Sequence, residues 1–318
     1  MTRNYNLLSL VIPMYNEESV LDSLFFKLFP VLDGLGSSYE IVCINDGSRD
    51  KTLEHLLMYQ KKYKDKIVVV DFHKNFGKES ALTAGLEFSR GDIVIPIDAD
   101  LQDPPELIPR LIEKWQQGAD EVLAVRGSRL SDTFLKRFTA IIFYKIFNTI
   151  SSLKIEYNAG DYRLIDRSIV DIVLQLPEKN RFMKGIFSWA SSGHVEKVEY
   201  VRDERVKGKS KFSYWKLFNF ALDGVTSFSS LPLRIWSYVG AVISMVSFLM
   251  MIFLFVDTLI IGNAVRGWAS MMCVLLFLGG VQLLSLGIMG EYIARIYTES
   301  KNRPLYVVRK CYRGKDSQ

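Results

Sequence analysis

Two acidic side chains separated by one residue are the feature of this 318-residue sequence most able to do chemistry. Asp98-Ala-Asp100 ends the apolar run Asp92–Ile97, and Gln102 follows two residues later. Side chains two residues apart on an extended chain point to the same side. Oxygen ligands in this arrangement suit Mg²⁺ or Mn²⁺ with coordination positions left open for a diphosphate. A solvated turn is the alternative, because Asp-x-Asp alone is a weak signal.

The elements that must position these acids alternate between strand and helix over residues 8–126. Short apolar runs of this kind are typical of parallel strands buried on both faces, joined by right-handed crossovers. Ligands of such sheets bind at the carboxyl ends of the strands. The expected strands are Leu8–Ile12, Glu40–Asn45, Ile67–Phe72, Ile93–Ile97 and Val122–Val125.

Helical patterns fill the intervals between these strands. The second helix is expected to begin at the N-cap Asp50, the third after Gly77, and the fourth around Pro104-Pro105. The first helix carries an apolar stripe, made of Val20, Leu21, Leu24, Leu28 and Leu32.

Two more strand ends carry candidate ligand-binding residues. Pro13 ends the first strand, Tyr15 could stack on a base, and Glu17 lies in the first turn of a helix. After the second strand, Asp46 could accept hydrogen bonds from a nucleobase or a ribose. The alternative for the first motif is an ordinary strand–turn–helix connection in which Glu17 interacts with the helix dipole. The alternative for Asp46 is an Asx turn in which Gly47 takes a positive φ.

Two uncharged apolar runs, Ile235–Val256 and Trp268–Gly290, are each long enough to cross a hydrocarbon core of about 30 Å. Buried core helices are the alternative, although such helices usually show a polar stripe. Lys and Arg gather before the first run and after the second, but are scarce between them. The positive-inside rule therefore predicts a multi-pass protein of the inner (cytoplasmic) membrane, with both termini and the α/β region cytoplasmic.

The flanks of the apolar runs carry further expectations. Residues 213–230 have aromatic and aliphatic side chains at helical spacing, which predicts an interfacial amphipathic helix or a core helix of the soluble domain. The net charge of +5 lies mostly beside these runs, which favours membrane lipid over nucleic acid as a partner. Gly279-Gly280, Gly287 and Gly290 would allow close helix contact, as in a homo-oligomer that is a dimer or a tetramer.

Eight short motifs follow one another along the chain: VIPMYNE from Val11, NDGS from Asn45, NFGK from Asn75, DADLQDPPE from Asp98, AVRGSR from Ala124, GDYRLIDR from Gly160, NRFMKG from Asn180 and GKSKF from Gly208. In this order, the motifs resemble those of family 2 glycosyltransferases with a GT-A fold, a Rossmann-like α/β domain with a parallel-core sheet. The closer likeness is to polyprenyl-phosphate sugar transferases, which include dolichyl-phosphate mannose synthases and the GtrB-like branch with its two-span tail.

The resemblance implies a role for each matching residue. The nucleotide would be held by Pro13, Tyr15, Glu17 and Asp46. The metal and the sugar diphosphate would be bound by Asp98, Asp100 and Gln102. The acceptor phosphate would be bound by Arg126 and Arg137. Arg205 and Lys211 would belong to a mobile segment that closes over the donor or the acceptor.

Some of these roles have simple alternatives. Arg137 could be an interfacial cation that touches lipid headgroups, and Arg205 with the GKSK stretch could be a solvated basic loop. Asp161 joins Asp100, Arg126 and Arg137 among the catalytic candidates. Its alternative is an ion pair with Arg163 that has no direct catalytic part.

The resemblance implies inverting transfer of a sugar, expected to be glucose from UDP-glucose, to polyisoprenyl (undecaprenyl) phosphate at the cytoplasmic face. A phosphate acceptor is already anionic, so no general base is expected. The alternative sugars on the same lipid phosphate are mannose from GDP-mannose and an aminoarabinose derivative. The alternative acceptor is a lipid hydroxyl. The alternative to an enzyme is a non-catalytic membrane scaffold. Processive synthases carry Gln-x-x-Arg-Trp where this chain has Asn180–Gly185, which favours a single transfer.

The expected organisation has four parts. These are a cytoplasmic catalytic domain over 1–212, a juxtamembrane amphipathic helix over 213–234, two transmembrane helices over 235–290, and a cytoplasmic basic tail over 291–318.

Overall fold

The chain forms two compact units. In the computed structural model, the first unit comprises Met1–Gly224 and Arg303–Gln318, and the second comprises Val225–Asn302. The described residues are 3–127, 156, 159–179, 181–191, 193–200 and 267–314, with single helical positions between 236 and 260.

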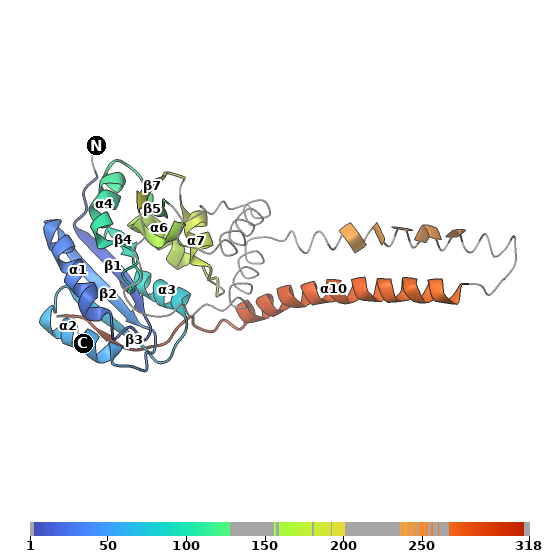
Figure 1. Cartoon of the computed structure of the whole chain (residues 1–318), viewed down its shortest axis with the longest axis horizontal. Helices are drawn as coiled ribbons and strands as arrows, with labels where there is room; N and C mark the ends of the chain where they lie inside the picture. Colours follow the sequence, from blue (N-terminus) through green and yellow to red (C-terminus); the bar gives the residue numbers. More distant parts are fainter. Residues whose placement is uncertain are drawn as a thin grey trace. The chain divides into compact units, whose positions relative to one another are not determined.

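An eight-stranded sheet with the order β7-β5-β6-β4-β1-β2-β3-β8 forms the centre of the first unit (Figure 1). Its parallel core consists of β1 (Leu7–Met14), β2 (Ser38–Asn45), β3 (Ile67–Phe72) and β4 (Ile93–Pro96). Nearly every residue of these strands is buried, which explains their continuous apolar and β-branched sequences. The parallel core expected from the sequence is confirmed.

Three strands that the sequence analysis did not single out complete the sheet. β5 (Glu121–Arg126), which was expected, pairs parallel with β7 (Val195–Tyr200) and antiparallel with β6 (Ala159–Asp166). β6 also pairs antiparallel with β4, and β8 (Val308–Tyr312) pairs antiparallel with β3. Because β6 and β8 run against the core, their first residues lie at the edge where the parallel strands end.

Helices cover both faces of the sheet, and the four that were expected are confirmed (Figure 1). One face carries α1 (Leu21–Gly34), α2 (Thr52–Lys62), the 3₁₀ turn η1 (Pro105–Leu107) and α4 (Ile108–Gln116). The other face carries α3 (Lys78–Phe88), α6 (Arg167–Gln175) and α7 (Met183–Ala190).

The helix starts follow local chemistry. α1 buries the expected stripe of leucines against the sheet. The N-cap of α2 is Lys51, one residue after the expected Asp50. Asp50 still lies next to the helix start, where its Oδ1 accepts hydrogen bonds from the backbone N–H (3.1 Å) and the hydroxyl (2.6 Å) of Thr52. Gly77 is the N-cap of α3, and Pro105 begins the turn that leads into α4.

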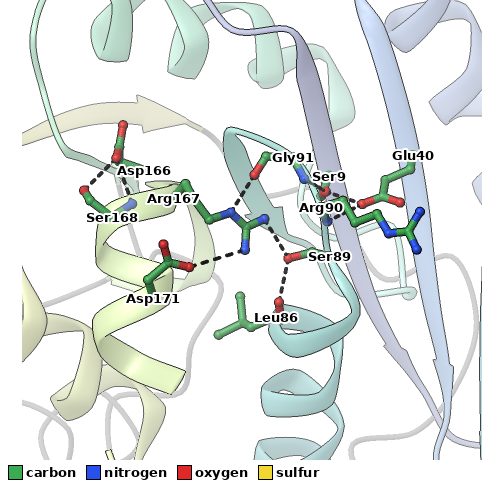
Figure 2. Close-up of polar contacts among 10 residues, drawn as sticks. All are labelled: Ser9, Glu40, Leu86, Ser89, Arg90, Gly91, Asp166, Arg167, Ser168 and Asp171. Atoms are coloured by element: carbon green, nitrogen blue, oxygen red, sulfur yellow. Dashed lines mark hydrogen bonds and ion pairs between the residues drawn. The ribbon is translucent and has the colours of Figure 1, made fainter. Parts of the chain in front are cut away.

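A polar network fastens the turn between α3 and β4 to its neighbours (Figure 2). Ser9 Oγ donates to Oε1 of Glu40 (2.7 Å), and the backbone N–H of Arg90 donates to the same oxygen (2.6 Å). The N–H of Gly91 donates to Ser9 Oγ (2.7 Å), while Nε of Arg167 donates to the Gly91 carbonyl (2.7 Å). These groups satisfy one another near the amino ends of β1 and β4, so we assign the network a structural role.

The second unit contains the 33-residue helix α10 (Trp268–Ser300). Its segment Phe277–Ser300 is long and apolar enough to cross a membrane. At 1.5 Å per residue, these 24 residues reach about 36 Å. Among the described residues this is the one candidate span, whereas the sequence predicts two. The predicted run Ile235–Val256 is described only at single helical positions.

The end of α10 differs from the expected end of the second apolar run at Gly290. The helix continues to Ser300 and stops where Asn302 takes a φ of 45°, with the Asn302 N–H donating to the Glu299 carbonyl (3.1 Å). A left-handed Asn followed by Pro304 is a common helix stop. Residues 291–318 are therefore not one tail, because they hold the end of α10 and all of β8. The segment 213–234 lies outside the described residues, and the domain boundaries stay a prediction.

We expect Gly85→Ala to destabilise the protein by about 1–3 kcal/mol, because a Cβ at this position of α3 would overlap Cγ1 of Val11 in β1. Gly34→Ala in α1 is the matched control, since nothing lies within 4 Å of its Cβ position. The control should stay within about 0.5 kcal/mol of the wild type. Thermal unfolding of the full chain in detergent measures both. Equal unfolding midpoints for the two variants would contradict the packing described for α3.

Candidate active site

One lysine joins two carboxylates at the carboxyl edge of the sheet. Nζ of Lys78, the first residue of α3, lies 2.6 Å from Oδ1 of Asp98 and 2.7 Å from Oδ2 of Asp161. Asp98 follows β4, and Asp161 stands near the start of the antiparallel β6, so opposite strand directions bring both to one edge. Arg163 pairs with Glu121 (Nη1 to Oε1, 2.6 Å), so the alternative of an Asp161–Arg163 ion pair is wrong.

The charges of this cluster support one another. Burial acts to raise the pKa of Asp161, but the ammonium groups of Lys78 and Lys184 outweigh it and hold that pKa below its usual range. Burial likewise acts to lower the pKa of Lys78, and the two carboxylates raise it above its usual range instead. Both partners of the ion pair are therefore charged at neutral pH.

Glu79 is the member of the cluster that titrates near neutrality. Burial and the negative charge of Asp161 raise the pKa of Glu79 to about 7. Its Oε2 accepts a hydrogen bond from the backbone N–H of Met183 (3.2 Å), which joins the start of α3 to the start of α7.

The loop after β4 is held in a strained conformation. Leu101 takes a φ of 58°, a region that residues with a side chain rarely adopt, and its side chain is 1% exposed. Oδ1 of Asp100 accepts a hydrogen bond from the backbone N–H of Gln102 (3.2 Å). Burial of Leu101 thus fixes a backbone that costs about 1–3 kcal/mol, and such strain is concentrated at functional sites.

The donor set of this loop fits a divalent cation. The carboxylates of Asp98 and Asp100 and the side-chain amide of Gln102 supply hard oxygens, which Mg²⁺ and Mn²⁺ prefer. Over the described ranges, no group of three or more His, Cys, Asp and Glu side chains is arranged to hold a metal ion. A cation here would therefore draw further ligands from phosphate oxygens or water, as Mg²⁺ sites commonly do.

Asp46 is tied to the loop that carries Lys78. Its side chain is buried, with Oδ1 accepting the backbone N–H of Phe76 (2.7 Å) and Oδ2 that of Gly77 (3.0 Å). Burial raises the pKa of Asp46 despite these two hydrogen bonds. An ionised carboxylate can accept about four hydrogen bonds, so two remain for a ligand. The residue expected to hold the nucleotide thus also positions the backbone next to Lys78.

A side-chain hydrogen bond of Asn45 closes the turn after β2. Oδ1 of Asn45 accepts the N–H of Ser48 (3.3 Å), three residues on, whereas an Asx turn uses the N–H two residues on; Gly47 takes a φ of 63° as expected. A Cβ on Gly47 would overlap the backbone of Lys74 and Asn75, so only glycine lets these two loops approach each other.

The other expected nucleotide-binding residues lie at the end of β1. Pro13, Tyr15 and Glu17 are half-buried there. Between them, Asn16 takes a φ of 55° and its backbone N–H donates to Oγ of Ser48 (3.0 Å), which joins this turn to the turn after β2. The two turns therefore form one surface at the sheet edge.

The expected acceptor-binding residues are described only in part. Arg126, at the end of β5, hydrogen-bonds to the hydroxyl of Tyr200 on β7, and that hydroxyl donates to Oδ1 of Asp103 (2.5 Å). Nε of Arg126 is buried and has no hydrogen-bond partner among the residues that the structure describes. Arg137, Arg205 and Lys211 lie outside the described residues.

The sequence analysis gave no role to four residues of this arrangement, namely Lys78, Glu79, Lys184 and Tyr200. Lys78 and Lys184 stand inside the quoted NFGK and NRFMKG motifs, and Lys78 directly follows the glycine expected to start a helix at the ligand-binding edge. That position was a usable signal. Tyr200 meets Asp103 across 97 residues of chain, a contact for which the sequence carries no local signal.

The chain belongs to glycosyltransferase family 2, whose model matches residues 9–173, and a second model, the GtrB C-terminal hairpin, matches residues 231–296. It is therefore a glycosyltransferase with the GT-A fold, and the hairpin associates it with a membrane. It is 53% identical over 308 residues to the SfII prophage-derived bactoprenol glucosyl transferase of Shigella flexneri, covering 96% of this chain and 99% of that protein.

Other relatives agree with this family. An uncharacterized glycosyltransferase of Synechocystis is 52% identical over 302 residues, covering 95% of this chain and 94% of its own. Mannosyl-3-phosphoglycerate synthase from Rubrobacter xylanophilus superposes with a TM-score of 0.51 at 15% identity, over 74% of this chain and 75% of that one. The latter likeness shows the fold alone.

We expect Glu79→Gln to stabilise the metal-free protein at pH 8 and to stabilise it much less at pH 5. The carboxyl pKa rises from the ordinary value of 4.5 to about 7 on folding, so the stabilisation from proton uptake is lost as pH rises between these values. Glutamine mimics the protonated acid, and the gain at pH 8 should be about 1–3 kcal/mol. Thermal unfolding in EDTA measures it, with the exposed Glu113→Gln as control. A gain at pH 5 equal to that at pH 8 would contradict the assignment.

Proposed function

We propose that this glycosyltransferase transfers glucose from UDP-glucose to a polyprenyl phosphate such as undecaprenyl phosphate, with inversion at the anomeric carbon. The observation that carries this proposal is the carboxylate pair bridged by Lys78, which lies beside the loops expected to hold the nucleotide. The sugar and the acceptor are supported by relatives of similar length that are named bactoprenol glucosyl transferases.

The donor would lie across the ends of β1, β2 and β4. We assign the nucleotide to Pro13, Tyr15, Glu17 and Asp46. We assign a divalent metal, Mg²⁺ or Mn²⁺, to Asp98, Asp100 and Gln102. When bound, such an ion offsets negative charge on the diphosphate leaving group. The ammonium of Lys78 adds a fixed positive charge at the same edge, and Asp161 holds this ammonium in place.

The acceptor phosphate needs alignment rather than a proton acceptor. Its oxygen is already anionic at neutral pH, so no residue is assigned as a general base. Arg126 is suited to the acceptor phosphate because its buried Nε lacks a partner, and an unpaired buried donor costs about 1–3 kcal/mol until it is satisfied. We assign Arg137 to the same phosphate, and Arg205 and Lys211 to a segment that closes over the substrates.

The membrane would confine the lipid acceptor beside the site. We propose that the hairpin crosses the inner membrane twice and that both termini and the catalytic domain are cytoplasmic, as the distribution of Lys and Arg indicates. Basic residues next to the hairpin would then attract anionic lipid. Close helix contact at the glycines of α10 would support a dimer or a tetramer.

The proposed substrates are tested by presenting the purified full chain in detergent with undecaprenyl phosphate and a panel of labelled nucleotide sugars. We expect labelled lipid with UDP-glucose, one glucose per lipid by mass spectrometry, and at least tenfold less product with GDP-mannose. Transfer from GDP-mannose at the same rate would overturn the sugar assignment. Product with diacylglycerol in place of the lipid phosphate would overturn the acceptor assignment.

We expect Asp100→Asn to lower kcat for lipid glucosylation about 100-fold or more, because it removes one anionic ligand of the proposed metal. Asp65→Asn, an exposed aspartate in the turn after α2, is the matched control and should retain wild-type activity. Removal of divalent ions with EDTA should abolish activity, and added Mn²⁺ should restore it in the control but not in Asp100→Asn. Undiminished lipid labelling by Asp100→Asn would remove the metal assignment.

A further inference from the structure

The C-terminal segment Tyr306–Arg313 forms the outer edge of the sheet beside β3, although it follows α10 in the chain. Val308 is in register with Phe72, and the backbone N–H of His73 donates to the Val307 carbonyl (3.0 Å). Because β8 is antiparallel to β3, the segment begins at the edge of the sheet that carries the candidate active site.

A polar route leads from this segment to the turn after β2. Nη1 of Arg309 lies 3.4 Å from Oδ2 of Asp71, and Nη2 donates to the carbonyl of His73 (3.0 Å). The Asp71 side chain is 2% exposed, and its Oδ1 accepts Nδ2 of Asn45 (2.7 Å). A buried carboxylate needs such a cation and such a donor. Arg309 thus compensates the charge of the carboxylate that orients Asn45, the residue before Asp46.

An aromatic route reaches the same place independently. The ring of Tyr306 stacks on Phe72 with centroids 4.9 Å apart and an angle of 9°. Phe72 in turn meets the ring of Phe76 edge to face at 5.8 Å. The backbone N–H of Phe76 donates to Oδ1 of Asp46 (2.7 Å). The hydroxyl of Tyr306 also donates to the carboxylate of Glu87 on α3.

The far end of the segment is fastened separately. Nη1 of Arg313 lies 3.3 Å from Oε2 of Glu40, a member of the polar network in Figure 2, and Nη2 donates to the carbonyl of Phe88. The segment is therefore anchored at both ends, and its contacts with Asp71 and Phe72 have a fixed register.

We propose that two residues of the segment Tyr306–Arg313, Arg309 and Tyr306, are positioning residues of the donor subsite that hold Asp46 for a nucleoside diphosphate. This inference rests on the proposed role of Asp46 in nucleotide binding. It has a consequence for the whole chain: a nucleotide site built from strands near the amino terminus is completed only by residues that follow the apolar hairpin. A catalytic domain truncated before Arg303 would lack both the contact of Arg309 with Asp71 and the contact of Tyr306 with Phe72.

The inference is tested with the full chain in detergent, by calorimetric titration of UDP in the presence of Mn²⁺ and by steady-state kinetics. Arg309→Ala and Tyr306→Leu should each raise the Kd for UDP and the KM for the donor about 3- to 30-fold, the range of coupling through packed networks. The acceptor KM should be unchanged. The thermal unfolding midpoint should fall in both variants, because Arg309→Ala leaves the buried Asp71 without its cation and Tyr306→Leu removes the ring stacked on Phe72. Arg309→Lys keeps a cation near Asp71 and should weaken UDP binding less than Arg309→Ala does.

Lys310→Ala is the matched control, because it removes a cation from the same strand whose amine lies over the ring of Tyr312. It should bind UDP as the wild type does. If Asp46→Asn binds UDP normally, the proposed role of Asp46 fails. If Asp46→Asn weakens UDP binding while Arg309→Ala and Tyr306→Leu match the Lys310→Ala control, the inference alone is overturned. A rise in the acceptor KM equal to that of the donor KM would also overturn it.

Discussion

The ion pair that Lys78 makes with Asp98 and Asp161 is the constraint on which the rest of the site depends. The carboxyl end of β4 and the start of the antiparallel β6 bring two carboxylates, Asp98 and Asp161, to one edge of the sheet. Two unit charges about 4 Å apart interact by about 4 kcal/mol near a protein surface, so carboxylates gathered there would repel or take up a proton unless a cation separates them. The ammonium of Lys78 holds the pKa of Asp161 below its usual range, so Asp161 stays charged and anchors the lysine between the two carboxylates.

The surrounding elements hold this lysine in position. Asp46 binds the two backbone N–H groups that precede Lys78, so the end of β2 fixes the start of α3. Gly47 lets the two loops approach, and β8 supports them from the edge of the sheet. Asp46, which we propose as a nucleotide-binding residue, and the charge cluster are therefore joined by one short loop, Phe76–Lys78.

The sequence predicted the parts whose signals are local. The buried strands, the helix start at Gly77 and the acidic triplet after β4 follow from apolar runs, caps and spacing, while the start of α2 lies one residue after the predicted N-cap Asp50. It did not reveal the partner of Asp161, because the choice between Lys78 and Arg163 depends on how β6 pairs with β4 and β5. It also missed β8 and the residues just before it. Arg309 contacts Asp71 and Tyr306 contacts Glu87, each across more than 200 residues of chain, which opposes the expectation of a basic tail. Charge in that segment suggested a membrane partner, while its alternating pattern was too short to stand out as a strand.

The most direct measurement of the central claim is the pH dependence of kcat/KM for lipid glucosylation in Lys78→Met compared with the wild type. Methionine retains the length of the side chain without its charge. Without the ammonium, the pKa of Asp161 should rise, so the acidic limb of the profile should move upward by about one to three pH units. An acidic limb at the same pH as in the wild type, with the same plateau rate, would contradict the account.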